Sequence, residues 1–248
     1  MKTHFKFTLI FSSMIFALIF SSCKTEETTE PQLKGTLIGW VKLYDEFGRR
    51  IADKSGVLLK FEGTNPLITA ITDSAGKFQV DNLPQGTFNV YCTKSGFATT
   101  TLLGLVFIGG NEPSARTITL TQPSTTVISN ISTKKDTVNK VNNLLFNVST
   151  NAPSGVAYYM SYFLSSSPNV SYQNYQATTI FATSTAVKNP VELRINADYR
   201  IFPSGSVVYI IAYGDTYTDP SYTDLNTGLV IYSALNSQPS NVASFVMP

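Results

Sequence analysis

Histidine and charged residues are scarce in this sequence of 248 residues, which contains one histidine and 14% Asp, Glu, Lys and Arg. The histidine, His4, lies in an N-terminal stretch with a positive start at Lys2 and Lys6 and a short apolar run. That pattern is typical of a secretory signal peptide, which is removed on export. We therefore expect the mature chain to contain no histidine, which excludes Ser-His-Asp and Cys-His catalysis and every His-ligated metal site.

The mature chain also lacks net charge and any helical pattern. Removing Lys2 and Lys6 takes the formal net charge from +2 to zero. A neutral chain has no basic surface of the kind that binds nucleic acid and no polybasic patch for anionic lipid. No segment of about ten residues repeats its apolar residues at helical spacing, so the sequence predicts β-strands throughout.

The apolar run Phe7–Phe20 is too short to span a membrane. As a helix it would reach about 21 Å, against a hydrocarbon core of roughly 30 Å. The residues that follow, Ser21, Ser22 and Cys23, resemble the lipobox of bacterial lipoproteins, in which the cysteine becomes the first mature residue and is lipidated. The resemblance implies a signal peptide at 1–22 and a lipid anchor on Cys23. An ordinary signal peptide followed by an incidental cysteine is the alternative.

The stretch 23–33 has few apolar residues and one proline, which is typical of a flexible tether. Its first residues, KTEE, resemble the Lys-plus-acidic signals that direct some Bacteroidetes lipoproteins to the outer face of the outer membrane. The resemblance implies a lipid-anchored protein of the cell outer membrane that faces the exterior. The same residues also suit a plain solvated linker, and both interpretations can hold together.

Residues 34–122 are predicted to form an antiparallel β-sandwich, because short apolar runs alternate there with turn residues. Asp73 can accept backbone N–H groups and Gly76 can take a positive φ, and the stretch Asn82–Gly86 has similar turn chemistry around Pro84. The predicted strands are GTLIGWVKL, GVLLKFEG, LITAIT, GKFQVDN, GTFNVYCT, GFATTTLLGLVF and RTITLT.

Within this segment, Thr72–Phe97 resembles the carboxypeptidase regulatory-like domain. That family has an Asp-x-x-Gly turn, an aromatic strand, a Leu-Pro-x-Gly turn, a strand with Tyr or Phe, and a Gly-aromatic step. The matching residues are, in order, Asp73, Gly76, Phe78, Leu83, Pro84, Gly86, Phe88, Gly96 and Phe97. The resemblance implies a small transthyretin-like sandwich of the kind appended to metallocarboxypeptidases, without that enzyme's zinc ligands.

Alternation in GTFNVYCT places Phe88, Val90 and Cys92 on one face of a strand. We expect Leu83 and Phe88 in the core and Gly86 at a positive φ. Cys92 is expected to be buried and unreactive, because no histidine or basic neighbour is placed to lower its pKa. With Cys23 lipidated, Cys92 is the only thiol, so no intramolecular disulfide can form.

Residues 123–248 are predicted to form a second β-sandwich, separated from the first by the polar stretch Thr121–Thr126. Of thirteen tyrosines, eleven lie between Tyr158 and Tyr232. The stretch IFPSGSVVYIIAYGD resembles the sixth strand of fibronectin type III and related Ig-like modules. There an aromatic residue hydrogen-bonds back to the preceding corner, a position that Tyr209 would take. The predicted strands are LLFNV, GVAYYMSYFLS, PVELRIN, SVVYIIAYGD, GLVIYSALN and ASFVMP.

Two short stretches match catalytic sequence motifs but lack the structural context that the chemistry of these motifs needs. LGLVFIGGNEP has the glycine spacing of a P-loop, but Gly110 and Asn111 stand where Lys and Ser or Thr are required, so we predict a strand and a turn. Ser132 and Lys135 match Ser-x-x-Lys, which acts at a helix start in a pocket, whereas we expect a polar loop here. The chain is therefore predicted not to be an enzyme and to need no cofactor.

The candidate binding segment is YGDTYTDPSYTDLNTG, Tyr213–Gly228, expected as a loop between the last two main strands. It could be a solvated loop whose Asp, Pro and Gly only form turns. It could be a recognition loop whose Tyr rings stack on a sugar or peptide while Asp accepts hydroxyl donors. It could also hold Ca²⁺ through Asp215, Asp219 and Asp224, although the spacing is not that of an EF-hand. The candidate ligand-binding residues are Asp215, Tyr217, Asp219, Tyr222 and Asp224.

Together these features predict a non-catalytic lipoprotein, attached to the membrane through Cys23, that presents two β-sandwich modules in tandem. Its predicted role is to bind or scaffold an extracellular glycan or protein, and not nucleic acid. The alternative is a carbohydrate-binding accessory lipoprotein of a polysaccharide-uptake system, by analogy with the frequent neighbours of the carboxypeptidase regulatory-like family.

Overall fold

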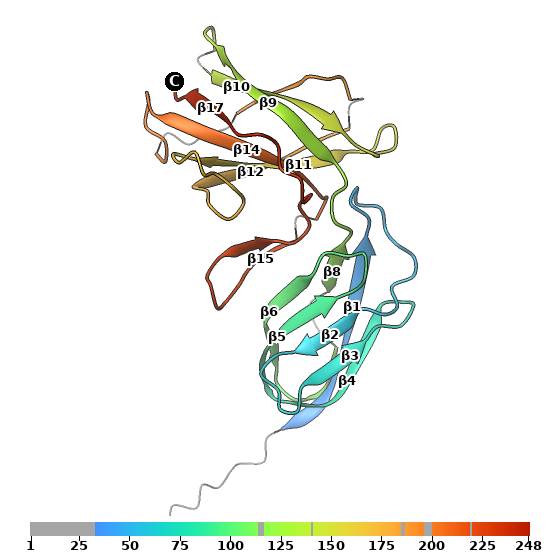
Figure 1. Ribbon diagram of the computed structural model, residues 1–248. Coiled ribbons are helices and arrows are strands. Elements are labelled where there is room, and N and C mark those ends of the chain that lie inside the picture. The colour runs from blue at the N-terminus through green and yellow to red at the C-terminus, as the bar shows by residue number, and fades with distance from the viewer. Residues whose placement is uncertain (1–32, 114–116, 140, 185–186, 196–199, 219) are drawn as a thin grey trace, which may run out of the picture. The chain divides into compact units, whose positions relative to one another are not determined.

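The computed structural model describes residues 33–113, 117–139, 141–184, 187–195, 200–218 and 220–248 (Figure 1). The predicted signal peptide, Cys23 and the tether up to residue 32 lie outside the described residues, as does Asp219. Within the described ranges, no helix has the length and hydrophobicity needed to cross a membrane.

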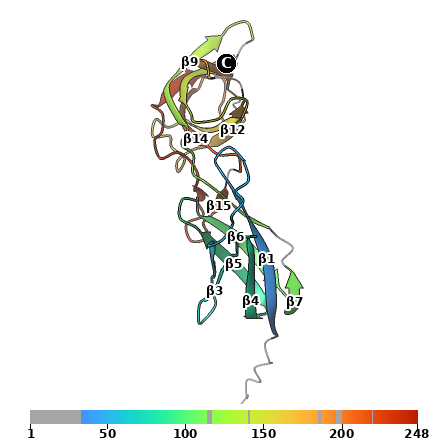
Figure 2. The ribbon, with the colours of Figure 1, turned by 90° about the vertical axis from the view of Figure 1, so that its right-hand side faces the viewer.

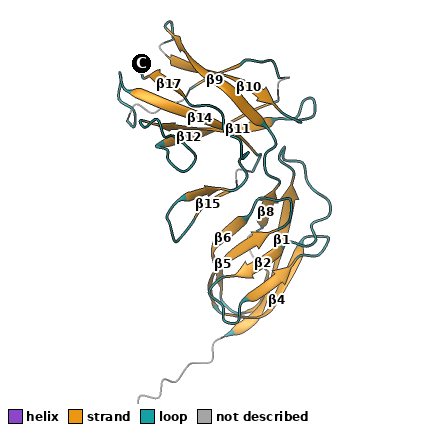
Figure 3. Ribbon diagram, viewed as in Figure 1, coloured by secondary structure: helices purple, strands orange, loops and turns teal. Residues whose placement is uncertain are grey.

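The described residues form strands, turns and loops and no helix, which confirms the all-β prediction (Figure 3). The chain makes two β-sandwiches, whose strands pair only within each sandwich in the part of the chain described. The strand β8, which ends at Thr121, pairs within the first sandwich, and β9, which begins at Val127, pairs within the second.

The first sandwich consists of two facing sheets. One has the order β3-β2-β5-β6; the other has the order β4-β1-β7, with β8 also paired to β1. The strands are β1 (Lys34–Tyr44), β2 (Leu58–Phe61), β3 (Ile68–Ile71), β4 (Lys77–Pro84), β5 (Gly86–Thr93), β6 (Thr100–Phe107), β7 (Gly110–Pro113) and β8 (Ile118–Thr121).

One part of this sandwich departs from the antiparallel prediction, because β7 and β8 both run parallel to β1. Figure 2 shows β7 beside β1, on the side away from β4. The sequence predicted only a turn at β7, because Gly-Asn-Glu-Pro has no apolar alternation. The pairing depends on a close backbone approach: a Cβ built on Gly35 would lie 1.8 Å from the carbonyl oxygen of Gly110. Only glycine fits at that position of β1.

The core of the first sandwich follows the predicted alternation. Leu83 is 0% and Phe88 7% exposed, which confirms both as core residues. The ring of Phe88 meets Phe61 edge-on, with 6.1 Å between the centroids. Cys92 is fully buried, and burial raises the pKa of its thiol to about 12, as expected for an inert core cysteine.

The turn around Pro84 differs from the prediction. Gly86 does not have a positive φ; the left-handed residue is Asn82, with a φ of 56°. Asn82 lies inside β4, near the point where the β1–β4 register shifts between Gly35 and Leu37. Asparagine tolerates this conformation better than most residues, so the chain bends at Asn82 and needs no left-handed glycine at the start of β5.

The second sandwich also has two sheets, with the orders β13-β10-β9 and β12-β11-β14-β17, and a separate hairpin of β15 and β16. Its core includes Phe146, Met160 and Phe202. The strands are β9 (Val127–Asp136), β10 (Val141–Ser149), β11 (Tyr158–Ser165), β12 (Ala177–Thr183), β13 (Val191–Arg194), β14 (Val207–Asp215), β15 (Ser221–Thr223), β16 (Val230–Tyr232) and β17 (Ala243–Val246).

The polar stretch between the sandwiches is held by hydrogen bonds to both of them, and Leu33–Pro248 form one compact unit. On the first sandwich, Gln122 N–H donates to the Tyr44 carbonyl at 3.0 Å; on the second, Ser124 N–H donates to the Ala234 carbonyl at 2.8 Å. Glu46 is a buried residue, 7% exposed. Its carboxylate accepts the N–H of Thr125 at 2.6 Å and the hydroxyls of Thr125 and Ser124. The connection is therefore fixed to both sandwiches.

Candidate binding site between the hairpin and the first sandwich

The predicted binding segment is not an open loop. Its first residues, Tyr213 to Asp215, complete β14, and Ser221–Thr223 form β15, which pairs with β16 in a hairpin. The hairpin lies against β6 of the first sandwich. The prediction of a loop between two main strands is therefore wrong in form: the segment bridges from the second sandwich to a face of the first.

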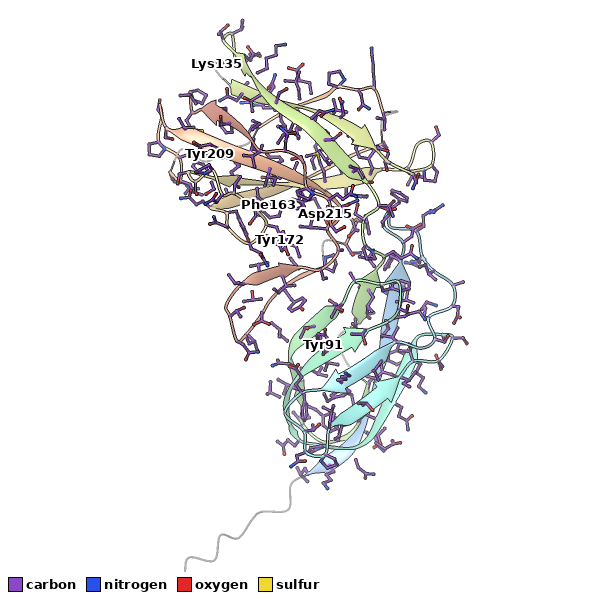
Figure 4. The ribbon with its side chains drawn as sticks, viewed as in Figure 1. Tyr91, Lys135, Phe163, Tyr172, Tyr209 and Asp215 are labelled. Atoms are coloured by element: carbon purple, nitrogen blue, oxygen red, sulfur yellow. The ribbon has the colours of Figure 1, made fainter. Side chains whose placement is uncertain are left out.

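Asp215 is a buried structural residue. It is 2% exposed and lies at the end of β14 (Figure 4). One carboxylate oxygen accepts the hydroxyl of Ser161 on β11, and the other accepts the N–H of Thr216 at 2.7 Å. These bonds join two neighbouring strands where the chain leaves the sheet, so the Asp215 carboxylate is engaged within the second sandwich.

Tyr217 packs at the junction of the two sandwiches. Its N–H donates to the Glu46 carbonyl at 3.1 Å, and its ring lies 6.3 Å from Tyr44 and 5.8 Å from Tyr159 between centroids. A Cβ built on Gly48 would lie 2.6 Å from the Tyr217 ring, so glycine is required there for this contact as well as for its φ of 85°. Tyr217 remains 54% exposed but serves as a junction contact.

Tyr222 and Asp224 lie on the hairpin and contribute to a pocket. Tyr222 belongs to β15 and forms a side-chain hydrogen bond with Thr101 of β6. Asp224 follows β15 and fixes the tip: its Oδ1 accepts the N–H groups of Asn226 at 3.0 Å and Thr227 at 2.8 Å, and the Thr227 hydroxyl at 3.0 Å. The hairpin thus presents a phenol and a carboxylate from one rigid turn.

The pocket, with a volume of about 220 Å³, lies between the hairpin and the outer face of the β3-β2-β5-β6 sheet. The first sandwich contributes residues that face away from its core: Glu62, Asn89, Tyr91, Thr101 and Leu103. The hairpin contributes a continuous run, Tyr222, Thr223, Asp224, Leu225 and Asn226. Figure 4 shows Tyr91 on the first sandwich.

Sequence reasoning missed the half of this pocket that the first sandwich supplies. The alternation that buried Phe88 and Val90 also placed Asn89 and Tyr91 on the opposite face of β5, and both are only half-buried. An outward-facing Tyr beside an Asn was the available signal. The sequence could not show that a hairpin more than a hundred positions later covers that face.

Acceptors dominate the electrostatics of the pocket. Burial raises the pKa of the Tyr222 phenol, and Tyr91, Asp224 and Glu62 raise it further, against the opposing hydrogen bond with Thr101. The turn N–H and the hydroxyl of Thr227 hold the pKa of Asp224 below its usual value. The residues that line the pocket include two carboxylates and no Lys or Arg.

The proposed calcium ligands take separate partners, so far as they are described. Asp215 bonds to Ser161 and Thr216, whereas Asp224 bonds within its own turn. In the ranges that the structure describes, no group of three or more His, Cys, Asp or Glu could hold a metal ion. Asp219, the third proposed ligand, lies outside those ranges.

Many of the tyrosines form a local packing cluster on the second sandwich instead of a binding loop. Phe163, fully buried, meets the rings of Tyr175, Tyr213 and Tyr232 edge-on, with centroid distances of 5.1, 5.6 and 5.1 Å. The hydroxyls of Tyr175 and Tyr232 lie 2.8 Å apart. Tyr209, expected at a corner, packs against the same cluster (Figure 4). Much of the tyrosine enrichment is therefore structural.

Ser132 and Lys135 lie on β9 and not in the loop that the sequence predicted (Figure 4 labels Lys135). They pair with Leu145 and Asn142 of β10. A strand does not offer the helix start that Ser-x-x-Lys chemistry uses.

Thr216 lies where the chain leaves β14, at the buried start of the segment that leads to the hairpin, and its role there can be tested directly. Its hydroxyl is buried and has no hydrogen-bond partner among the described residues. A buried unpaired polar group costs about 1–3 kcal/mol, so Thr216→Val is expected to raise the free energy of unfolding by about 1 kcal/mol in urea titrations. Thr126→Val is the matched control: the equally buried hydroxyl of Thr126 contacts Thr150 Oγ1 at 2.9 Å, so this change should destabilise. Destabilisation by Thr216→Val would mean that its hydroxyl is bonded in solution.

No protein-family model and no curated protein sequence matches the chain. Among solved structures, it is similar to a candidate carbohydrate-binding protein of Bacteroides uniformis, at 11% identity and a TM-score of 0.32, over 86% of this chain and 99% of that one. It is similar to a DUF3823 family protein of Bacteroides ovatus, at 12% identity and a TM-score of 0.29, over 85% and 99%. It is also similar to a type II cohesin–X-dockerin complex of Acetivibrio cellulolyticus, at 21% identity and a TM-score of 0.30. That match covers 36% of this chain and 59% of the other, so this chain spans less than two thirds of its length.

Proposed function

We propose that this chain is a non-catalytic binding lipoprotein, anchored to the outer membrane by a lipid on Cys23 and facing the cell exterior. Its ligand occupies the pocket between the hairpin and the first sandwich, and the ligand is a carbohydrate. The observation that supports this is the composition of the pocket: two Tyr side chains, two Asn amides and two carboxylates meet there.

The chemistry of these side chains suits a sugar. Tyr91 and Tyr222 offer apolar rings with polar tips at low entropy cost, as in antibody binding loops. Asn89, Asn226 and the two carboxylates accept hydroxyl donors. The volume of about 220 Å³ is below the roughly 300–1,000 Å³ of pockets for drug-sized ligands, so the pocket suits one sugar unit of a longer chain.

Loss of the Tyr91 ring tests the site. The full mature chain, kept soluble by Cys23→Ser, would be screened on a glycan array, and the affinity for each bound glycan measured by calorimetry. Tyr91→Ala is expected to weaken binding about 30-fold, since truncation of an aromatic anchor costs about 2 kcal/mol. Thr87→Ala is the control and should bind normally, because Thr87 is an exposed residue on the same face of β5 as Tyr91, one outward-facing position before Asn89.

Two results would reject this function. One is an array without any bound glycan while a pull-down recovers only proteins, which favours a protein-scaffolding role. The other is unchanged glycan affinity in Tyr91→Ala, which would move the site elsewhere on the chain.

The anchor has its own test. Cys23→Ser is expected to leave the protein without lipid and to release it from membranes, because acylation contributes about 0.8 kcal/mol per buried CH₂ group and position 23 no longer has a thiol to be acylated. Membrane fractionation and labelling with a fatty-acid probe measure both effects. A Cys23→Ser protein that still incorporates the probe and sediments with the outer membrane would contradict the anchor.

A further inference from the structure

The two carboxylates of the pocket form no ion pair with the cations of the described residues. The ion pairs found among the described residues are Arg49–Asp45 and Lys134–Glu192, and neither involves Glu62 or Asp224. The described hydrogen bonds to Asp224 all use Oδ1, which leaves Oδ2 outside the turn. Two like charges therefore face one small site that contains no positive side chain.

Both carboxylates act electrostatically on the phenol of Tyr222. Each raises the pKa of the Tyr222 phenol, one from the sheet side of the pocket and one from the hairpin side. A ligand group beside Tyr222 would therefore feel two negative charges from the pocket lining, whereas Lys60, which pairs with Tyr91 from β2, does not line the pocket. An anionic sugar would be repelled there, whereas a cation would be attracted.

We propose that the sugar bound in this pocket carries a free, protonated amine: the pocket selects an amino sugar over neutral and acidic sugars. This inference rests on the proposed carbohydrate-binding function. The ammonium group lies between Glu62 and Asp224, the sugar ring lies against Tyr91 or Tyr222, and the hydroxyls bond to the Asn amides. The selectivity comes from charge-assisted hydrogen bonds, which are shorter and stronger than neutral ones.

Three β-1,4-linked oligomers of equal length would test this selectivity: those of glucosamine, N-acetylglucosamine and glucose. They differ only in the group on C2, which is an ammonium, a neutral acetamide or a hydroxyl. Calorimetry on the soluble mature chain is expected to show binding of the glucosamine oligomer about tenfold tighter than that of the glucose oligomer at low salt. The preference should shrink as salt is added and as the pH rises until the amine loses its proton.

The variants Glu62→Gln and Asp224→Asn should each weaken binding of the glucosamine oligomer more than binding of the glucose oligomer, so the preference for the amine falls. Asparagine at 224 keeps an oxygen for the turn N–H groups, so the hairpin is retained. Asp81→Asn is the matched control, because Asp81 is an exposed carboxylate that accepts from Thr36 and Gln79 and does not line the pocket.

The outcomes separate this inference from the function on which it rests. Glycans without an amine that bind as tightly as amino sugars, with Tyr91→Ala still weakening them, would overturn the inference and keep the function. Binding that requires Ca²⁺ and is lost on chelation would assign the carboxylates to the metal and also overturn it. An equal effect of Asp81→Asn would attribute the preference to overall charge. The absence of any glycan binding would reject both.

Discussion

Replacement of Phe88 by alanine is expected to lower the free energy of unfolding of the first sandwich by about 3–5 kcal/mol, the cost of removing a buried phenylalanine ring. Phe88 is 7% exposed and packs edge-on against Phe61, so its loss leaves a cavity between the two sheets. Few single changes cost this much, because most substitutions destabilise by only 0.5–3 kcal/mol.

The chain contains a probe that makes this measurement specific. Its one tryptophan, Trp40, lies on β1 of the first sandwich, opposite Lys77 of β4. Tryptophan fluorescence during urea unfolding therefore reports the first sandwich, whereas circular dichroism reports both. Val106→Ala, at a 65% exposed position of β6, is the control and should change stability by less than about 0.5 kcal/mol. An unchanged fluorescence midpoint in Phe88→Ala would contradict the sandwich core.

The core could be predicted from the sequence because strand alternation is local information. Leu83, Phe88 and Cys92 were placed correctly from neighbours one or two positions away. The sequence missed β7, β9, β12 and β15, and two of these strands, β7 and β15, lack this signal. Residues 110–113, in β7, carry no apolar alternation, and β15 is three residues long, inside a stretch whose Asp, Pro and Gly are typical of turns.

The lining of the pocket was predicted only in part, for a different reason. Composition pointed to Tyr222 and Asp224, which line the pocket, and equally to Tyr217 and Asp215, which do not. Burial decides between these cases: Asp215 is 2% exposed and bonded to Ser161. The partners of Tyr222 on the first sandwich are distant in sequence, and only the hairpin brings them together.

The hairpin is positioned by the tight contact of Gly214 with the connection between the sandwiches. Gly214 lies on β14, and a Cβ built on it would be 1.8 Å from the carbonyl oxygen of Thr126 and 2.9 Å from the hydroxyl of Ser124. Its φ lies outside the left-handed region, so the constraint is space and not backbone conformation. The obstacle is mainly a backbone carbonyl, which cannot move aside as a side-chain end could.

Gly214→Ala is therefore expected to cost about 3 kcal/mol or more. Crowding a packed site typically costs 1–3 kcal/mol, and here the displaced stretch also carries the hydrogen bonds of Ser124 and Thr125 to the buried carboxylate of Glu46. Because β14 leads into the hairpin, the same change should also weaken glycan binding at the pocket. Urea unfolding followed by circular dichroism and calorimetric titration measure the two effects.

Gly86→Ala is the matched control for Gly214→Ala. Gly86 also lacks a positive φ, and a Cβ there would meet only the ring of Phe88, at 3.3 Å. The cost of crowding should nearly cancel the entropy that alanine removes from the unfolded chain, so the net change should stay within about 1 kcal/mol. If Gly214→Ala unfolds at the same urea concentration as Gly86→Ala and binds glycan normally, the close contact with Thr126 does not hold the hairpin on the first sandwich.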